Sequence, residues 1–177
     1  TGISGDRSVK PHDGVQLQEA ELQFLSDVDP YFRANALFSV SQEDGKSSYG
    51  IDPEEIYLET ISLPYVTVKA GKFKAALGKD NQLHTHAFPF VDQPLINSRL
   101  LGDEGLNEAG ASVAGLLSFL SWFSELTLQG ISLGNDQLFA SRNSGDLGYL
   151  AHFKNLWDLS DSTTLELGLS GVQGNNQ

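Results

Sequence analysis

Residues 17–41, LQEAELQFLSDVDPYFRANALFSVS, alternate apolar and polar side chains on both sides of a central Asp29-Pro30 pair. Alternation with a period of two is typical of a β-strand with one apolar face, and Asp-Pro favours a turn. The stretch therefore predicts two antiparallel strands, 17–28 and 31–41, joined by a tight hairpin.

The same alternation recurs along the rest of the chain. Further strands are expected at 54–62, 66–78, 111–121, 125–133, 146–157 and 163–171. Tight turns join the strands in pairs, and longer polar segments separate the pairs, the longest being 79–110. A transmembrane β-barrel has this asymmetry, because its short turns lie on one side of the bilayer and its long loops on the other. The pattern predicts an all-β fold, an antiparallel up-and-down meander that forms a transmembrane β-barrel.

Charged residues on the polar faces indicate how the strands pair. When the apolar faces of each hairpin are aligned, Asp27 lies opposite Arg33 and Glu59 lies opposite Lys69. Opposite charges across a strand pair are favourable by about 0.2–1 kcal/mol. In a barrel this face would line the lumen. The predicted pore-lining residues are Arg33, Glu55, Glu59, Lys69, Lys72 and Lys74.

The fourth strand changes its pattern at Gly71. Apolar residues occupy even positions before this glycine and odd positions after it, beginning with Phe73. One extra residue at a glycine is typical of a β-bulge. The pattern therefore predicts a bulge there, with Lys72 and Lys74 on the face that carries Lys69.

Composition narrows the class of protein. The 177 residues carry a formal net charge of −12, which disfavours binding to nucleic acid because phosphates would be repelled. The absence of cysteine excludes disulfides, thiol catalysis and cysteine-based zinc sites. No run of eighteen apolar residues predicts a transmembrane helix. The chain also lacks a nucleophile elbow, a P-loop and a dinucleotide-binding fingerprint, so the sequence does not predict an enzyme.

A soluble antiparallel β-sandwich would show the same alternation. Two observations favour the barrel: expected strands of about nine to twelve residues, and aromatic residues beside the short turns. These aromatics are Tyr31, Phe32, Tyr65, Trp122, Phe123 and Trp157. The expected organisation is an irregular lead-in at 1–16 and a barrel region at 17–177. Because residues after Gly171 read as the opening of another long loop, the chain is expected to form part of a larger barrel.

The long segment 79–110 contains His84 and His86, which would project the same way from an extended chain. Both imidazoles could then reach one Zn²⁺ ion, with Asp80, Asp92 or His12 supplying further ligands. The alternative is structural, with the histidines hydrogen-bonded to loop carbonyls, and the shortness of the motif favours it. In a barrel the apolar residues of this segment would let it fold into the lumen as a constriction.

Five stretches resemble a family of uncharacterised bacterial outer-membrane, porin-like β-barrel proteins. They are VDPYFRA at 28–34, PEEIYLET at 53–60, KAGKF at 69–73, HTHAF at 84–88 and DQPL at 92–95. The resemblance covers about residues 17–133, and its most specific part is the histidine-bearing loop. Family members often have Trp where this chain has Phe88. The resemblance implies the outer membrane of a Gram-negative-type bacterium and a barrel longer than this chain.

The sequence thus predicts an outer-membrane, porin-like channel that passes small solutes or ions. Its expected partners are outer-membrane lipid and the transported solutes, with no nucleic acid; formation of a homo-oligomer is left open. One alternative is an outer-membrane uptake receptor that binds a metal or ligand through His84 and His86. Another is a soluble surface β-sandwich that acts as a binding module.

Overall fold

The computed structural model describes residues 19–42, 48–84, 87–89, 94–102, 105–135, 138–139 and 146–174. The strands are β1 (Ala20–Asp27), β2 (Phe32–Gln42), β3 (Tyr49–Thr60), β4 (Val66–Lys74), β5 (Asn107–Leu116), β6 (Phe123–Ser132), β7 (Leu147–Ser160) and β8 (Thr163–Gln173). Two short helices, η1 (Asp80–Gln82) and α1 (Leu95–Leu101), lie between β4 and β5. The expected lead-in at 1–16 lies outside the described residues.

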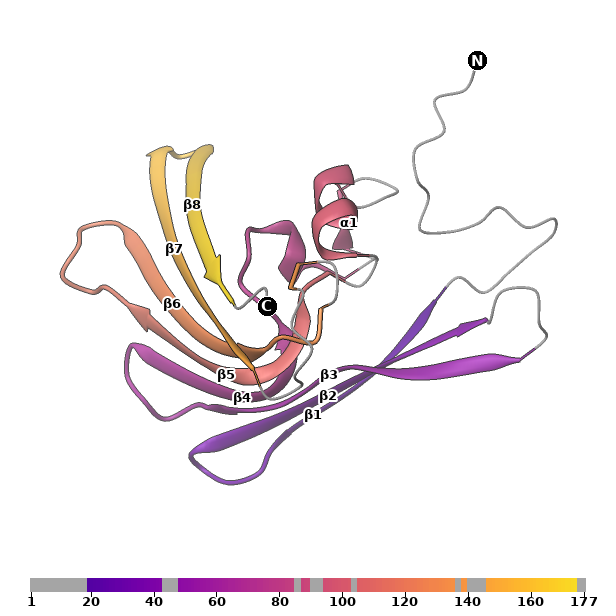
Figure 1. The fold of residues 1–177 in the computed structure, drawn as a ribbon. Helices are drawn as coiled ribbons and strands as arrows, with labels where there is room; N and C mark the ends of the chain where they lie inside the picture. The colour runs from indigo at the N-terminus through magenta and orange to yellow at the C-terminus, as the bar shows by residue number, and fades with distance from the viewer. Residues whose placement is uncertain are drawn as a thin grey trace, which may run out of the picture.

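All eight strands form one antiparallel sheet in the order of the sequence (Figure 1). The predicted all-β, up-and-down meander is therefore confirmed. The two-sheet sandwich is not the fold of the described residues, because every one of these strands belongs to the same sheet. The sheet is open, since β1 and β8 stand at its two ends and do not pair with each other.

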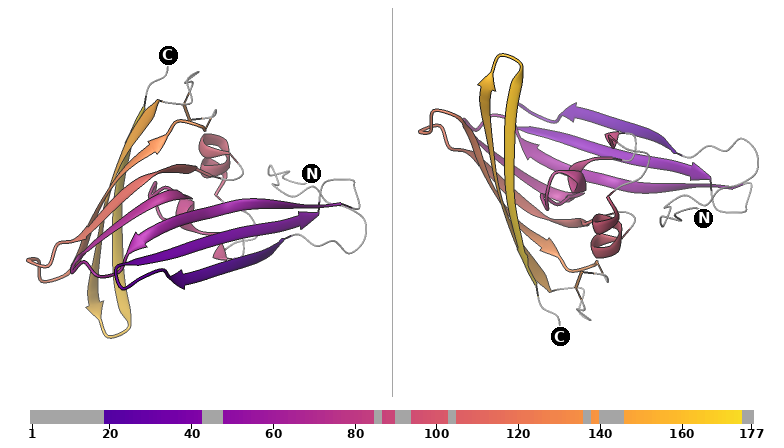
Figure 2. Two further views of the ribbon diagram at one scale, coloured as in Figure 1. Left: turned by 90° about the horizontal axis from the view of Figure 1, so that it is seen from below. Right: turned by 90° about the horizontal axis from the view of Figure 1, so that it is seen from above.

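The sheet is strongly curved (Figures 1 and 2). From β4 to β8 it curls around the segment that contains η1 and α1, while β1 to β3 extend as a long twisted arm. In the described part of the chain, neither helix is long and apolar enough to cross a membrane.

The two predicted charge pairs are confirmed by the strand register. Asp27 lies opposite Arg33 in the first hairpin, and Glu59 lies opposite Lys69 in the second. Arg33 also lies opposite Glu59, so the four residues form one row of alternating charge across β1 to β4. Arg33 Nε donates to Asp27 Oδ1 at 2.7 Å. Alignment of the apolar faces was sufficient to fix this register.

The predicted bulge at Gly71 is wrong. β4 pairs with β3 and with β5 without a register shift through this glycine. The extra residue is in β3 instead, where Glu55 lies opposite Leu37 but Pro53 lies opposite Phe38, so that Glu54 has no partner of its own. The consequence for β4 is that Lys72 lies opposite Ile56, and that Phe73 shares a face with Lys69.

Each strand has one face turned to the inside of the curve, here called the inner face, and an opposite outer face. One row of the inner face consists of Thr67, Ala114, Thr127, His152 and Ser170. The neighbouring row of the outer face consists of Val68, Val113, Leu128, Ala151 and Gly171. In β6, Thr127 is 6% exposed and Leu128 is 51% exposed. At this point of β6 the inward polar side chain is thus buried, and the outward apolar side chain is exposed.

The apolar core lies at the long-loop end of the inner face, between the sheet and the segments that follow β4 and β6. Its large members are Phe73, Leu101, Leu106, Ile131, Leu133, Phe139 and Leu150. This core explains the misplaced bulge, because Phe73 faces inward and packs against loop residues instead of joining the outer face. The apolar residue at position 73 of β4 therefore reflects a contact with the loop and does not indicate a bulge.

The bounds of several strands also differ from those expected. β4 ends at Lys74, four residues before its predicted end. β5 begins at Asn107 and ends at Leu116, about four residues earlier than predicted. Residues 117–122 form the turn, in which Leu117 N–H donates to Ser124 O at 2.9 Å. The irregular alternation of Leu116 and Leu120 reflects this turn. β3 begins at Tyr49, because the hairpin with β2 continues to the Gln42–Tyr49 pair.

Candidate functional site

Residues 75–84, here called the crossing segment, pass over the inner face from β4 to β8. Ala76 N–H donates to Gln129 Oε1 in β6 at 2.8 Å, and Gly78 N–H donates to Ser170 Oγ in β8 at 2.9 Å. Polar side chains of the inner face therefore bind the backbone of the segment. This satisfies peptide groups that would otherwise be buried without partners.

Ion pairs hold the crossing segment at two distant strands. Lys79 Nζ lies 2.6 Å from Glu166 Oε2 in β8. Five residues later, His84 Nδ1 lies 2.8 Å from Glu54 Oε2 in β3. The segment thus connects the end of the sheet at β8 with the arm formed by β1 to β3.

Asn81 fixes the middle of the crossing segment. Its Nδ2 donates to Ala75 O at 2.7 Å and to Leu106 O at 3.1 Å, and its Oδ1 accepts from Leu106 N–H at 2.7 Å. The side chain is buried, with 5% exposure of the residue. One amide therefore ties the first and last residues of the β4–β5 connection to its centre.

The bulge at Glu54 creates the environment of His84. Consecutive residues of a regular strand point to opposite faces, but a bulge turns two of them to the same side. His84 accordingly has Glu54 at Nδ1 and Glu55 Oε2 at 3.8 Å from Nε2. The hydrogen bond to Glu54, and next to it the nearby carboxylate of Glu55, raise the pKa of His84 to about 9. The imidazole is therefore held as a cation at neutral pH.

Two adjacent cavities lie between the crossing segment and the inner face. One has a volume of about 250 Å³, and its lining includes Glu59, Lys69, Lys74, Glu125 and Lys154. The other has a volume of about 530 Å³, and its lining includes Lys79 and Glu166. Gln82, His152 and Lys154 line both cavities. The space is polar and carries charges of both signs.

The structure brings some of the predicted pore-lining residues together and separates others. Glu59, Lys69 and Lys74 line the smaller cavity. Glu55 lies on the inner face, where its Oε1 accepts from Lys74 N–H at 2.9 Å. Arg33 belongs to the inner-face charge row.

Lys72 takes a different place. The register puts it beside the outer-face residue Ile56, and its Nζ donates to Pro53 O at 2.8 Å.

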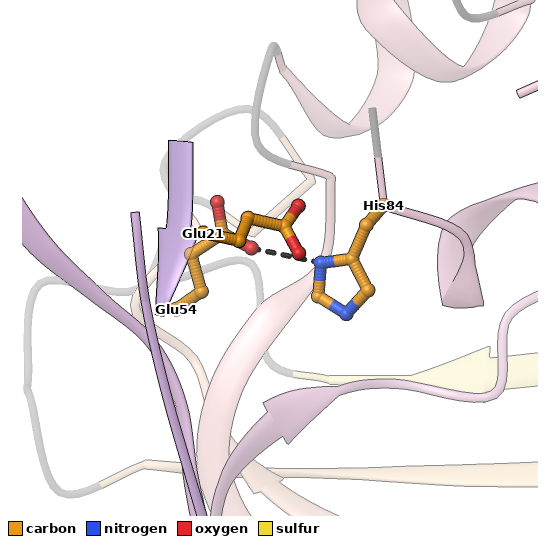
Figure 3. Close-up of side chains that lie close together, drawn as sticks. All are labelled: Glu21, Glu54 and His84. Carbon is orange, nitrogen blue, oxygen red and sulfur yellow. Dashed lines mark hydrogen bonds and ion pairs between the residues drawn. The ribbon is translucent and has the colours of Figure 1, made fainter. Parts of the chain in front are cut away.

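The expected zinc partner of His84, His86, lies outside the described residues. Among the described residues, Glu21 and Glu54 approach His84, and ligand atoms of all three residues lie within 4.8 Å of one another (Figure 3).

Sequence reasoning missed Glu21, Glu54 and Asn81. The signal for Glu54 was the Glu54-Glu55 doublet after Pro53, which interrupts the alternation of β3. Glu21 fits its alternation and gives no local sign of a partner 63 positions away in the chain. Asn81 is one of several polar residues in the loop, and nothing in the sequence distinguishes it.

The comparisons with known proteins add one relative. An uncharacterised protein of Aquifex aeolicus (strain VF5) is 42% identical over 101 residues, which are 56% of this chain and 20% of that protein. The matched part therefore spans about a fifth of the length of the relative. No family model matches the chain, and no solved structure matches it.

Proposed function

We propose that this chain forms part of an outer-membrane, porin-like β-barrel channel that passes small solutes or ions, with the crossing segment as its constriction. The observation that carries the proposal is the inversion of the two faces of the sheet.

The outer face suits lipid. Rows of apolar residues run across neighbouring strands, and many of them are exposed: Leu22, Phe24, Ile56, Leu58, Val113, Leu126, Leu128, Phe153, Leu165, Leu167 and Leu169. An apolar surface this wide on a protein in water is rare unless something covers it. The hydrocarbon of a bilayer would cover this surface. The strands have eight to fourteen residues, which includes the length that a tilted strand needs to cross a bilayer.

The aromatic residues beside the short turns support the same orientation. Tyr31 and Tyr65 are 60% and 63% exposed at the first two tight turns. At the third, the rings of Trp122 and Trp157 lie 6.2 Å apart, and Trp122 Nε1 donates to Asn155 Oδ1 at 3.2 Å. Amphipathic rings at one end of the strands suit a membrane interface.

The inner face suits a water-filled passage. Its charged row and its two cavities present polar groups to the space that a closed barrel would enclose. The crossing segment spans that space from β8 to β3, which is the arrangement of a constriction loop.

The open edges of β1 and β8 imply further strands. Within a bilayer the unpaired peptide groups of a sheet edge need partners, and a closed barrel supplies them. We therefore propose that strands of a longer protein pair with β1 and β8. The greater length of the Aquifex relative is consistent with this.

The test is conductance of the full-length protein that contains this chain, reconstituted in planar bilayers. Stepwise currents are expected. Lys69→Gln should change the ratio of anion to cation permeability, because Lys69 lines the inner cavity. Lys72→Gln is the matched control on the same strand and should leave the ratio unchanged, since the register places Lys72 on the outer face. Absence of any current, or equal effects of the two variants, contradicts the proposal.

A further inference from the structure

We propose that Glu21, Glu54 and His84 form a binding site for a divalent transition-metal ion, which joins the crossing segment to β1 and β3. The site differs from the His84 and His86 pair expected from the sequence, because two of its three ligands come from the sheet. It does not depend on the channel, and its test requires no transport.

The first support is the convergence of three segments that are distant in sequence. Glu21 comes from β1, Glu54 from the bulge of β3, and His84 from the crossing segment. Their ligand atoms lie within 4.8 Å of one another and are partly buried (Figure 3). Imidazole nitrogen and carboxylate oxygen are both zinc donors, and three such ligands leave a fourth tetrahedral position for water.

The second support is the orientation of the imidazole. Its Nδ1 faces Glu54, whereas its Nε2 faces the carboxylate of Glu55 at 3.8 Å. Histidines that bind metal through one nitrogen commonly have a carboxylate on the other, which fixes the tautomer and the ring orientation. Glu55 is therefore the positioning residue of the site, and Nδ1 is the ligand atom. On binding, His84 releases its imidazolium proton to solvent, and the ion replaces the hydrogen bond to Glu54.

The third support is an excess of carboxyl groups. Glu21, Glu54 and Glu55 all approach the imidazole of His84. Three carboxyl groups thus share one imidazole, and a bound divalent cation would balance their charge.

The fourth support is an unpaired acceptor next to Glu54. Asn107 Nδ2 donates to the backbone oxygen of Glu54 at 2.8 Å, but its Oδ1 is buried and has no hydrogen-bond partner among the described residues. A buried acceptor of this kind is commonly explained by an ion or a water in its neighbourhood.

The identity of the metal follows from the donors. An imidazole favours zinc and its first-row neighbours, whereas calcium and magnesium prefer sites built from oxygen alone. Zn²⁺ is therefore the probe, and Mg²⁺ is the competitor that should fail to displace it.

The experiment is a calorimetric titration of the purified full-length protein in detergent with Zn²⁺, after treatment with a chelator. One ion per chain is expected. His84→Gln, Glu54→Gln and Glu21→Gln should each weaken binding by more than about tenfold, and Glu55→Gln by about tenfold, as for outer carboxylates at other metal sites. His152→Gln is the matched control, because His152 bonds to Ser170 in a different part of the inner face, and its affinity should be unchanged.

X-ray absorption of the zinc-loaded wild type keeps the proposal testable if a variant does not fold. The expected spectrum has a first shell of nitrogen and oxygen atoms at about 2.0 Å, together with the outer-shell scattering of one imidazole ring. A spectrum without imidazole scattering, the absence of zinc binding, or undiminished affinity in folded His84→Gln protein overturns the proposal. Loss of conductance with zinc binding intact would contradict the channel alone.

Discussion

The outer and inner faces of the sheet differ in what surrounds them. In β6, the side chains of Thr127 and Gln129 point inward and are 6% and 7% exposed, while Leu128 between them is 51% exposed. A sheet in water normally buries its apolar face against other elements and leaves the polar face to solvent. Here the crossing segment occupies the polar face and the apolar face is bare. The crossing segment therefore buries polar groups in the middle of the inner face, whereas the apolar core buries apolar groups at its long-loop end.

The largest change in stability is expected from a substitution on the outer face. Leu128→Arg should lower the unfolding free energy in lipid bilayers by about 2–4 kcal/mol, because the guanidinium would lie in hydrocarbon. If the outer face were in water, the same substitution at an exposed residue would change the unfolding free energy by no more than about 0.5 kcal/mol. Urea titration of the protein in vesicles distinguishes these values.

Leu159→Arg is the matched control. Leu159 is also exposed, at 63%, but it lies next to the tight turn between β7 and β8. The cost near an interface should fall to about 0–1 kcal/mol. Equal costs at Leu128 and Leu159 would contradict a bilayer around the outer face.

The next effect tests the inner face. Asn81→Ala removes an amide that makes three hydrogen bonds to backbone groups. It leaves the buried Leu106 N–H without this acceptor, whereas Ala75 O and Leu106 O keep their bonds from Leu77 N–H and Ala75 N–H. The expected loss is about 1–3 kcal/mol of unfolding free energy, with faster hydrogen exchange in the crossing segment. Gln82→Ala, at the exposed neighbour, should change neither quantity. Similar behaviour of the two variants would show that Asn81 does not hold the segment.

A smaller effect is expected from pH in metal-free protein. The pKa of His84 is raised to about 9, mainly by its hydrogen bond to Glu54. A raised pKa means that the stabilisation is complete below the unfolded value of about 6.5 and is lost as pH rises through 9. Hydrogen exchange in the crossing segment, corrected for its intrinsic pH dependence, should therefore accelerate above pH 9. His84→Gln should abolish this pH dependence, and persistence of the step in the variant would assign it to another group.

The smallest effect is expected at the other end of the crossing segment. Lys79→Ala removes the ion pair with Glu166, in which the Lys79 side chain is 69% exposed. Solvent weakens such pairs, so the thermal midpoint should change little. The Gly78–Ser170 hydrogen bond would continue to hold the segment at β8. A loss as large as that of Asn81→Ala would show that the exposed pair carries the attachment.

Much of the fold follows from local patterns. Alternation located all eight strands, and alignment of apolar faces gave the pairs Asp27–Arg33 and Glu59–Lys69. The pattern failed at β4, because Phe73 is apolar for a reason outside its own hairpin. It packs against residues of the β4–β5 connection and of β6, and those contacts leave no periodic trace in the sequence.

The candidate site was less predictable. His84 was identified as a candidate ligand, but its observed neighbours Glu21 and Glu54 depend on the position of a single bulge. The extra residue in β3 decides whether Glu54 faces inward or outward, and a shift of one residue reverses every side chain of a strand. Local alternation predicts strand register well but predicts bulges poorly, because a bulge is stabilised by partners elsewhere in the fold.

The attachment of the crossing segment at two strands has a mechanical consequence. An open, curved sheet has one soft deformation, a change in its radius of curvature, which moves β8 relative to β3. The crossing segment connects β8 directly with β3 across the inside of the curved sheet. His84 is the fifth residue after Lys79, so their Cα atoms can be at most about 18 Å apart. The length of the crossing segment therefore limits the distance between β8 and β3, whatever curvature the strands alone would adopt.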